Sequence, residues 1–324
     1  MDSFFYQTNY LNYQTQKGCD MLREIKVEMK KTLVVKESAI ENVMIALLSG
    51  GHVLIEDLPG LGKTTLAKSF AKVNDCTFNR IQFTPDLMPS DLIGISIFDK
   101  QTQRFEFQKG PIFGNILLAD EINRTSPKTQ SSLLEAMEET QVTIDGHTYL
   151  LEEPFMVIAT ENPIEQQGTF PLPEAQLDRF MMRISLGYPS IDEEIDILTL
   201  KETTDVIKPV VSRAKIAEMI EEVDRVFVDP AVKAYVVKLC KATRENTSVR
   251  LGASPRTSVH LFKAAKAKAY LEGRDFVIGK DVHDLFETIV SHRILLKGEA
   301  VYRGISVKQL VEDILRSIEL PRID

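Results

Sequence analysis

Short apolar runs alternate with helical patterns over the first 187 residues of the chain. Three of these runs are almost continuously apolar, as expected for parallel strands that helices cover on both faces. This alternation of strands and helices predicts an α/β fold built on one parallel sheet. The strand candidates are residues 52–56, 78–83, 115–119, 155–159 and 181–186.

Helices are predicted in the intervals between these strands. Leu66, Phe70 and Val73 recur at helical spacing and predict one buried helical face. Another helix is expected to begin at Ser126-Pro127, because serine is a favoured N-cap and proline suits the first helical position. The expected apolar face of that helix consists of Leu133, Leu134 and Met137.

Two insertions interrupt the alternating pattern. Residues 93–110 contain two β-prone runs around a polar turn, which predicts a hairpin. Residues 141–151 contain Asp145-Gly146 between β-prone flanks, and this dipeptide suits the tight turn of a hairpin. Both insertions are therefore expected to form hairpins.

The strand pattern stops after residue 188. Ser190 and Glu193 have the spacing of a capping box that opens a helix, and the sequence from there to residue 324 has helical periodicity. We therefore expect an α/β core over residues 1–187 and a smaller helical domain over residues 188–324. The length of the chain also suits two domains better than one compact core.

Composition narrows the functional classes. The chain is 44% hydrophobic and 27% charged, which is ordinary for a soluble globular protein, and its net charge of −8 argues against broad coating of nucleic acid or anionic membrane. Its three cysteines are far apart and lack metal-ligand spacing, which favours a reducing compartment. Neither a signal-peptide pattern nor a run of about 18 apolar residues is present, so we expect a cytoplasmic protein.

The residues after the first strand candidate match a phosphate-binding loop, G-x-x-x-x-G-K-[ST], except at its first glycine. Gly60 and Gly62 allow backbone N–H groups to converge on anionic oxygens. Lys63 adds a cation, and Thr64 can ligate Mg²⁺ through its hydroxyl. The expected nucleotide-binding residues are Asp57, Pro59, Gly60, Leu61, Gly62, Lys63, Thr64 and Thr65.

Asp57 occupies the position where the pattern has its first glycine. This position falls where the predicted strand ends, so a residue other than glycine is acceptable if the turn avoids positive φ. The alternative is that Gly-Lys-Thr arose by chance in a strand–helix turn. The predicted strand before the loop and the predicted helix after it favour the phosphate loop.

Polar residues follow two further strand candidates. Asp120 and Glu121 come directly after a buried strand, at the edge where ligands bind in open α/β sheets. We expect Asp120 to hold Mg²⁺, usually through water, and Glu121 to orient and deprotonate the water that attacks the γ-phosphate. Asn162 follows the next strand, and its amide can hydrogen-bond the γ-phosphate or that water. The competing interpretations are surface acids for the pair and a turn former before Pro163 for Asn162.

Five further segments of the chain are EDLPGLGKTTLAK, FTPDLMPSDLIG, KGPIFGNILLADEINRTSPKTQSSLLEAMEE, ATENPIEQQGTFPLPEAQLDRF and GASPRTSVHL. Together these segments closely resemble the MoxR family of AAA+ ATPases. The resemblance runs in order from about residue 20 to the end of the chain. Many members of the family also carry Glu-Asp before the loop, so Asp57 resembles a family variant.

The resemblance implies a RecA-like αβα core with strand order 5-1-4-3-2, followed by a helical lid. It also implies that ATP binds with Mg²⁺ at the seam between subunits of a ring, commonly a hexamer. By the same likeness, the hairpins at 93–110 and 141–151 are the helix-2 insert and the pre-sensor-1 hairpin, which typically face the pore or the partner.

Two arginines are candidates for contacts across that seam. Arg179 resembles the arginine finger that reaches the ATP of the neighbouring subunit, and its competing interpretation is a surface ion pair with Asp178. Ser254 and Pro255 predict the start of a helix, so Arg256 lies in the first turn, where the helix dipole disfavours a cation. An anion is therefore expected near Arg256. By likeness it is the sensor-2 arginine, in cis or in trans.

The leading hypothesis is an ATP-hydrolysing, ring-forming remodeller of a separate partner protein. By resemblance, that partner often carries a von Willebrand factor A domain, and the activity assists maturation, metal insertion or complex assembly. A nucleic-acid motor is the main alternative, but the insertions offer few basic residues, which disfavours it. Those residues are Lys100, Arg104 and Lys109, opposed by Asp99 and Glu106. A third possibility is a nucleotide-dependent switch that hydrolyses ATP very slowly.

Overall fold

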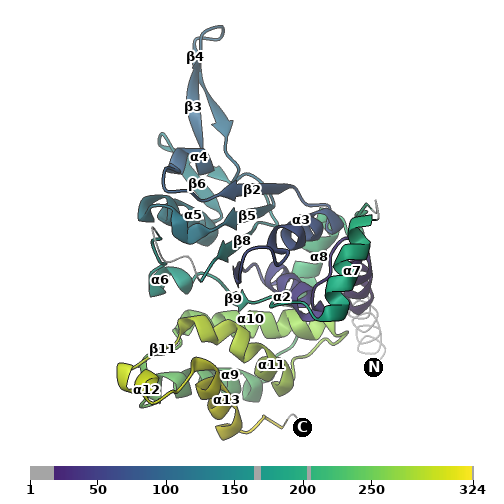
Figure 1. The fold of residues 1–324 in the computed structure, drawn as a ribbon, viewed down its shortest axis with the longest axis vertical. Helices are drawn as coiled ribbons and strands as arrows, with labels where there is room; N and C mark the ends of the chain where they lie inside the picture. Colours follow the sequence, from purple (N-terminus) through teal and green to yellow (C-terminus); the bar gives the residue numbers. More distant parts are fainter. Residues whose placement is uncertain (1–17, 164–168, 203–205, 323–324) are drawn as a thin grey trace, which may run out of the picture.

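The computed structural model describes residues 18–163, 169–202 and 206–322 and contains a five-stranded parallel sheet (Figure 1). Read from one edge, the strand order is β9-β1-β8-β5-β2, which is the 5-1-4-3-2 order that the family resemblance implied. Each strand begins or ends within two residues of its predicted position. The strands are β1 (Val53–Glu56), β2 (Phe78–Gln82), β5 (Ile116–Asp120), β8 (Met156–Glu161) and β9 (Met182–Ile184).

Helices cover both faces of this sheet, because side chains alternate between the two faces of each strand. One face packs against α2 (Glu37–Leu48) and α3 (Lys63–Val73), and the opposite face packs against α5 (Pro127–Glu139). Both predicted apolar helical faces are confirmed. The buried residues among those predicted are Leu66, Phe70 and Val73 on α3 and Leu133, Leu134 and Met137 on α5.

Both predicted hairpins are present. The first joins β3 (Gly94–Asp99) to β4 (Arg104–Lys109) after the short helix α4 (Pro89–Ile93), and it projects from the core (Figure 1). The second joins β6 (Gln141–Ile144) to β7 (His147–Leu150). Asp145 and Gly146 in its turn both have positive φ, at 50° and 78°, as the turn type requires.

The remainder of the chain is mainly helical, as predicted. Ser190 and Glu193 form the expected capping box before the first of these helices. One feature of this region was not predicted: β10 (Val249–Leu251) pairs antiparallel with β11 (Leu295–Leu296). Strands of three and two residues are too short for an alternation pattern to be visible in the sequence. The helices are α7 (Ile191–Glu202), α8 (Arg213–Asp224), α9 (Pro230–Glu245), α10 (Pro255–Leu271), α11 (Gly279–Val290), α12 (Gly298–Tyr302) and α13 (Val307–Ser317).

The helical region is fastened to the core by a shared hydrophobic cluster. Helices α8 and α10 contact α2, and α11 contacts β9, so apolar packing continues from the sheet into the helices. Residues 18–30 are also helical and bury Ile25 and Met29 in the same cluster. In the described part of the chain, no helix has both the length and the apolar character needed to cross a bilayer.

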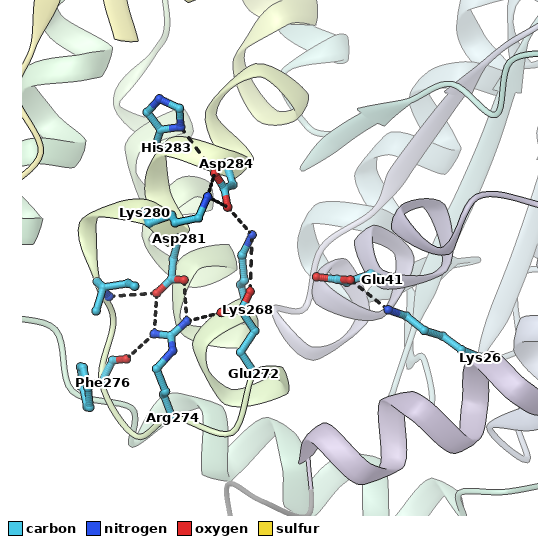
Figure 2. A network of polar contacts seen from close by, with 11 residues as sticks. Lys26, Glu41, Lys268, Glu272, Arg274, Phe276, Lys280, Asp281, His283 and Asp284 are labelled. Atoms are coloured by element: carbon cyan, nitrogen blue, oxygen red, sulfur yellow. Dashed lines mark hydrogen bonds and ion pairs between the residues drawn. The ribbon is translucent and has the colours of Figure 1, made fainter. Parts of the chain in front are cut away.

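Helices α10 and α11 pack against each other, and Figure 2 shows polar contacts that join them. At the turn between them, Arg274 donates to both carboxylate oxygens of the buried Asp281, at 2.6 and 2.8 Å. Lys268 on α10 and Lys280 on α11 both contact Asp284, each at 3.0 Å. These contacts fix the two helices relative to each other, so the start of α10 and the end of α11 lie at the same end of the pair.

Candidate nucleotide-binding site

The phosphate loop joins β1 to α3 at the carboxyl edge of the sheet. Gly60 and Gly62 have φ angles of 86° and 87°, in the left-handed region that glycine adopts without strain. Gly62 is the N-cap of α3, and no side chain caps the helix. The N–H groups of the first turn therefore remain available to an anion, which the helix dipole also favours. The loop has the donors that a phosphate group needs.

Asp57 is buried where β1 passes into the loop, and its φ angle is not positive, as the sequence argument required. The carboxylate accepts hydrogen bonds from the Ser185 hydroxyl at 2.7 Å and from the N–H groups of Leu186 and Gly187. The side chain therefore fastens the beginning of the loop to the end of β9. Any contact between Asp57 and a nucleotide would come from its backbone.

Lys63 begins α3 and its ammonium group is held by backbone carbonyls. Nζ donates to the carbonyl oxygens of Asp57 at 2.6 Å and of Glu161 at 3.4 Å. Burial lowers the pKa of the Lys63 amine, and nearby carboxylates, Asp57 first, oppose that shift. The amine thus lies at the ends of β1 and β8, beside the loop whose anion it is expected to bind.

Asp120 ends β5 and is held from two directions. One carboxylate oxygen accepts from the Thr160 hydroxyl at 2.6 Å, and the other accepts from Arg80 Nη2 at 2.6 Å. Thr64, the expected second Mg²⁺ ligand, lies partly buried in the first turn of α3. The described residues contain no cluster of three or more His, Cys, Asp or Glu side chains that could hold a metal. One hydroxyl and one carboxylate fit Mg²⁺ bound together with nucleotide phosphates and water.

Glu121 follows Asp120 in a left-handed conformation, with φ 57° and ψ 53°. This conformation is uncommon for glutamate, and such residues concentrate at functional sites. The Glu121 carboxylate accepts from Gln82 Nε2 and from Arg124 Nη1, both at 2.8 Å. The sequence analysis missed Arg80 and Gln82 as partners of the acidic pair. The signal available in the sequence was that Arg80 and Gln82 occupy alternate positions of the strand candidate, and the structure places Gln82 opposite Asp120.

Asn162 is buried immediately after β8, at the same edge of the sheet as the acidic pair. Its neighbour Glu161 is opposite Glu56 in the register of β8 and β1. Burial, and then the charge of Glu56, raise the pKa of Glu161 to about 7, while Arg183 opposes the shift. Arg183 itself pairs with Glu56 at 2.7 Å. The edge thus concentrates carboxylates beyond the number that the sequence motifs indicated.

A cavity of about 430 Å³ opens beside the phosphate loop. Its size is within the range of small-molecule sites. Residues 31–36 and 186–189 line it together with the loop, and the sequence analysis did not predict these segments. The signal available in the sequence for the first of these segments was an apolar run at 33–35 that belongs to no strand. The predicted residues that line the cavity are Gly60, Leu61, Gly62 and Thr65, whereas Pro59 is exposed at the start of the loop.

Arg179 and Arg256 converge on one carboxylate of the same chain, Glu138 on α5. Arg179 Nε lies 3.1 Å from one oxygen of Glu138, and Arg256 Nη2 contacts the other oxygen. The anion expected near Arg256 is therefore present, and it belongs to a helix of the core. The suggested ion pair between Arg179 and Asp178 is wrong, because Asp178 binds Arg293 instead.

The predicted start of the helix that carries Arg256 is confirmed. Ser254 is the N-cap of α10, its hydroxyl accepts from the N–H of Thr257, and Pro255 occupies the first helical position. The structure therefore contains two groups of predicted residues. The phosphate loop, the acidic pair and Asn162 meet at the sheet edge, and the two arginines meet at Glu138.

Known proteins resemble this chain over most of its length. A family model described as "ATPase family associated with various cellular activities (AAA)" matches residues 52–182, and a model of the AAA lid domain matches residues 241–314. The uncharacterized protein YeaC of Bacillus subtilis is 50% identical over 281 residues, which are 86% of this chain and 88% of YeaC. A crystal structure of a candidate ATPase from Cytophaga hutchinsonii has a TM-score of 0.90 at 39% identity and covers 98% of this chain and 99% of that chain.

Two further relatives bear the name that the sequence motifs suggested. Chaperone MoxR1 of Mycobacterium tuberculosis is 40% identical over 92% of this chain and 81% of its own length. Protein MoxR of Methylorubrum extorquens is 30% identical over 92% of this chain and 94% of its own length. With the fold and the lid in place, the chain belongs to the MoxR family of AAA+ ATPases.

Proposed function

We propose that this protein hydrolyses MgATP at the carboxyl edge of its sheet and uses the reaction to remodel a partner protein. The observation that carries the proposal is the continuity of the site. A cavity of about 430 Å³ opens on the glycines of the phosphate loop, and Lys63 and the acidic pair lie at the strand ends beside that loop. This arrangement suits a base in the cavity and phosphates on the loop.

The chain supplies distinct groups for binding and for chemistry. The N–H groups at the start of α3 would hold the phosphates, and Lys63 would exchange its two carbonyl partners for phosphate oxygens. Thr64 and Asp120 would hold Mg²⁺, which supplies charge that neutralises the phosphate oxygens when bound. Glu121 would orient the attacking water and accept its proton, while Asn162 would donate a hydrogen bond to the γ-phosphate or to that water.

The positions of Arg179 and Arg256 support assembly of the protein into a ring. Arg179 is part of the same chain as the loop, yet its ion pair is with Glu138 on α5. We propose that Arg179 acts on the ATP of a neighbouring subunit in a ring, for which a hexamer is the expected size. A planar cation that is always protonated suits the charge that develops on the transferred phosphoryl group. Arg256 would then report the state of a nucleotide to the helical lid.

The proposed client is a separate protein, as the word chaperone in the name of one relative suggests. A client with a von Willebrand factor A domain and a cytoplasmic setting belong to the same proposal, and both rest on the family resemblance. The β3–β4 hairpin offers exposed apolar side chains, Ile95, Phe98 and Phe105, for a protein contact.

The proposal is tested by comparing the wild type with Glu121→Gln. The wild type should hydrolyse MgATP, and Glu121→Gln should retain nucleotide while its turnover falls by about 10²–10³-fold, because it lacks the proton acceptor. Glu135→Gln, an exposed glutamate on α5, is the matched control and should behave as wild type. Full turnover by Glu121→Gln would remove that residue from the reaction, and failure of the wild type to retain any adenine nucleotide would overturn the proposed function.

A further inference from the structure

Arg293 is an arginine in the interior of the molecule that neither the motifs nor the proposed chemistry use. It follows α11, in the short helix η2 (Ser291–Arg293), and is only 5% exposed. A buried guanidinium is costly unless its donors are satisfied. Two contacts of Arg293 go to the carbonyl oxygen of Ile289 and to Nδ1 of His260, and the other four are directed at one short stretch of the chain. That stretch is the turn at 178–181, which carries Arg179.

The contacts of Arg293 surround Arg179 on both sides. Nε donates to the carboxylate of Asp178 at 2.7 Å, and Nη2 donates to the carbonyl oxygens of Asp178 at 3.0 Å and of Phe180 at 2.6 Å. Nη1 donates to the carbonyl oxygen of Met181 at 3.2 Å. Arg293 also caps the end of α11, but most of its hydrogen bonds serve the turn. The backbone before and after Arg179 is therefore attached to a single guanidinium group.

Two other residues of the lid hold the same turn. The hydroxyl of Ser254, the N-cap of α10, donates to Asp178 at 2.9 Å. His292 Nε2 is hydrogen-bonded to the carbonyl oxygen of Phe180 at 3.0 Å. The contacts drawn in Figure 2 join α10 to α11, so Arg293 and His292 after α11 are connected to the helix that begins beside Arg256. The turn that carries Arg179 therefore connects the lid to the core, because the N–H of Met181 also donates to the carbonyl oxygen of His52 at 2.8 Å.

We propose that Arg293 is a positioning residue: it fixes the turn at 178–181 to the lid and thereby aims Arg179 at the neighbouring subunit. This inference rests on the proposed role of Arg179 in trans. A shift of the lid on nucleotide binding would change the contacts of Arg293 with this turn, so that the state of one subunit changes the arginine presented to the next. Arg293 itself touches no substrate in this account.

A double-mutant cycle tests the inference, because two residues that act through one another give non-additive effects. Arg293→Lys keeps the charge but replaces a fork of five donors by a point charge. Turnover of Arg293→Lys should fall by about 10-fold or more, while the affinity of its own site for ATP stays within about twofold of wild type. In the Arg179→Ala background the same change should reduce turnover by less than about twofold.

The matched control is Arg274→Lys, the same substitution in an ion pair that lies within the lid. Arg274 pairs with Asp281 at the far end of α10 and α11. If Arg274→Lys affects turnover at all, its effect should multiply with that of Arg179→Ala. If Arg293→Lys fails to fold, Asp178→Asn replaces it in the cycle, because it weakens the same attachment with little change of shape.

The outcomes separate this inference from the proposed function. If Arg179→Ala retains full turnover, the trans arginine itself is wrong. If Arg179→Ala is impaired and the effect of Arg293→Lys multiplies with it, only the positioning role is wrong. A further readout is rescue: assemblies that mix Arg293→Lys subunits with Glu121→Gln subunits should regain turnover, since the latter provide intact arginines. A purely structural defect in the Arg293→Lys subunits would leave the mixture inactive.

Discussion

The phosphate loop and the arginine cluster differ in how completely one chain satisfies them. At the loop, two glycines adopt positive φ and no side chain caps the start of α3, so backbone N–H groups are available to a ligand. The Lys63 amine there is held by backbone carbonyl oxygens. At Glu138, two arginines are already paired within the chain. The first region has N–H donors that an anion could accept, and the second already holds a carboxylate. In our account, the second region becomes catalytic only when a neighbour offers a better anion.

The strength of the contacts supports this difference. The side chains of Arg179, Arg256 and Glu138 are 29%, 39% and 37% exposed, and ion pairs with such exposure are weak. Phosphate oxygens carry more charge and suit the planar guanidinium group, so they can displace one shared carboxylate. By contrast, Asp57 is buried and accepts hydrogen bonds from three consecutive residues, so the loop is held in place. A site shared by two subunits requires a phosphate loop that stays in place and arginines that can leave their carboxylate partner for the ATP of a neighbour.

The largest effect is expected for Arg179→Ala. Turnover should fall by about 10³-fold, the scale of other trans-acting arginines, while the affinity of the unassembled subunit for ATP stays unchanged. Steady-state hydrolysis and equilibrium nucleotide binding provide the two measurements. Loss of ATP affinity in the isolated subunit would place Arg179 in its own site and erase the distinction between the two regions.

Lys63→Ala should produce the opposite pattern. Its amine lies beside the loop, so ATP affinity of the isolated subunit should fall by about 100-fold, because a buried charge-assisted contact is lost. Titration with a fluorescent ATP analogue measures this change. Lys72→Ala, in the last turn of the same helix, is the control and should bind normally. Unchanged affinity in Lys63→Ala would show that the loop does not hold the phosphates.

Glu161→Gln tests the half-buried carboxylate pair of Glu161 and Glu56 through the pH dependence of stability. The pKa of Glu161 is raised to about 7 from 4.5, so the folded protein binds this proton more tightly than the unfolded chain. The stabilisation from that proton is complete below pH 4.5 and is lost as the pH rises through 7. Glu161→Gln should therefore be more stable than wild type at pH 8, by about 1–3 kcal/mol, with most of the gain gone at pH 5. Urea-unfolding midpoints at both pH values, with Glu135→Gln as control, check this; a gain independent of pH would contradict it.

Glu138→Gln should have the smallest effect of these substitutions, and it should make assembly easier. The substitution removes the charge that competes for both arginines, so the ATP concentration for half-maximal assembly should fall by about two- to fivefold. Sedimentation at increasing ATP measures the shift, again against Glu135→Gln. A rise in the required ATP concentration would mean that Glu138 aligns the arginines for the neighbour rather than occupying them.

The parts of the site that were predictable are those in which neighbours in sequence are also neighbours in space. The phosphate loop, the acidic pair and the start of α10 each depend on a few consecutive residues and on local backbone rules, and all appear where predicted. The sheet order came from the family resemblance, since strand spacing alone does not determine it. The assignment of 1–187 and 188–324 as two domains stays a prediction, because hydrophobic packing is continuous between α2 and the helical region.

Contacts between distant segments could not be predicted in this way. Asp178 was considered a partner for Arg179 because the two are adjacent, but adjacent residues on a turn point in different directions, and Asp178 points to Arg293. Glu138, Gln82 and Arg293 gained their significance only when the tertiary structure placed them beside motif residues. In the sequence, Glu138 cannot be distinguished from the many glutamates that lie on the solvent-exposed faces of helices.

The central claim is that ATP binds between two copies of this chain, with the loop from one and the arginine from the other. Mixing two inactive variants tests it most directly. Arg179→Ala subunits retain Glu121, and Glu121→Gln subunits retain Arg179, so a shared site becomes complete wherever the second follows the first. Equal mixing in a head-to-tail ring should restore about a quarter of wild-type turnover. No recovery in assemblies shown to contain both variants would contradict the claim.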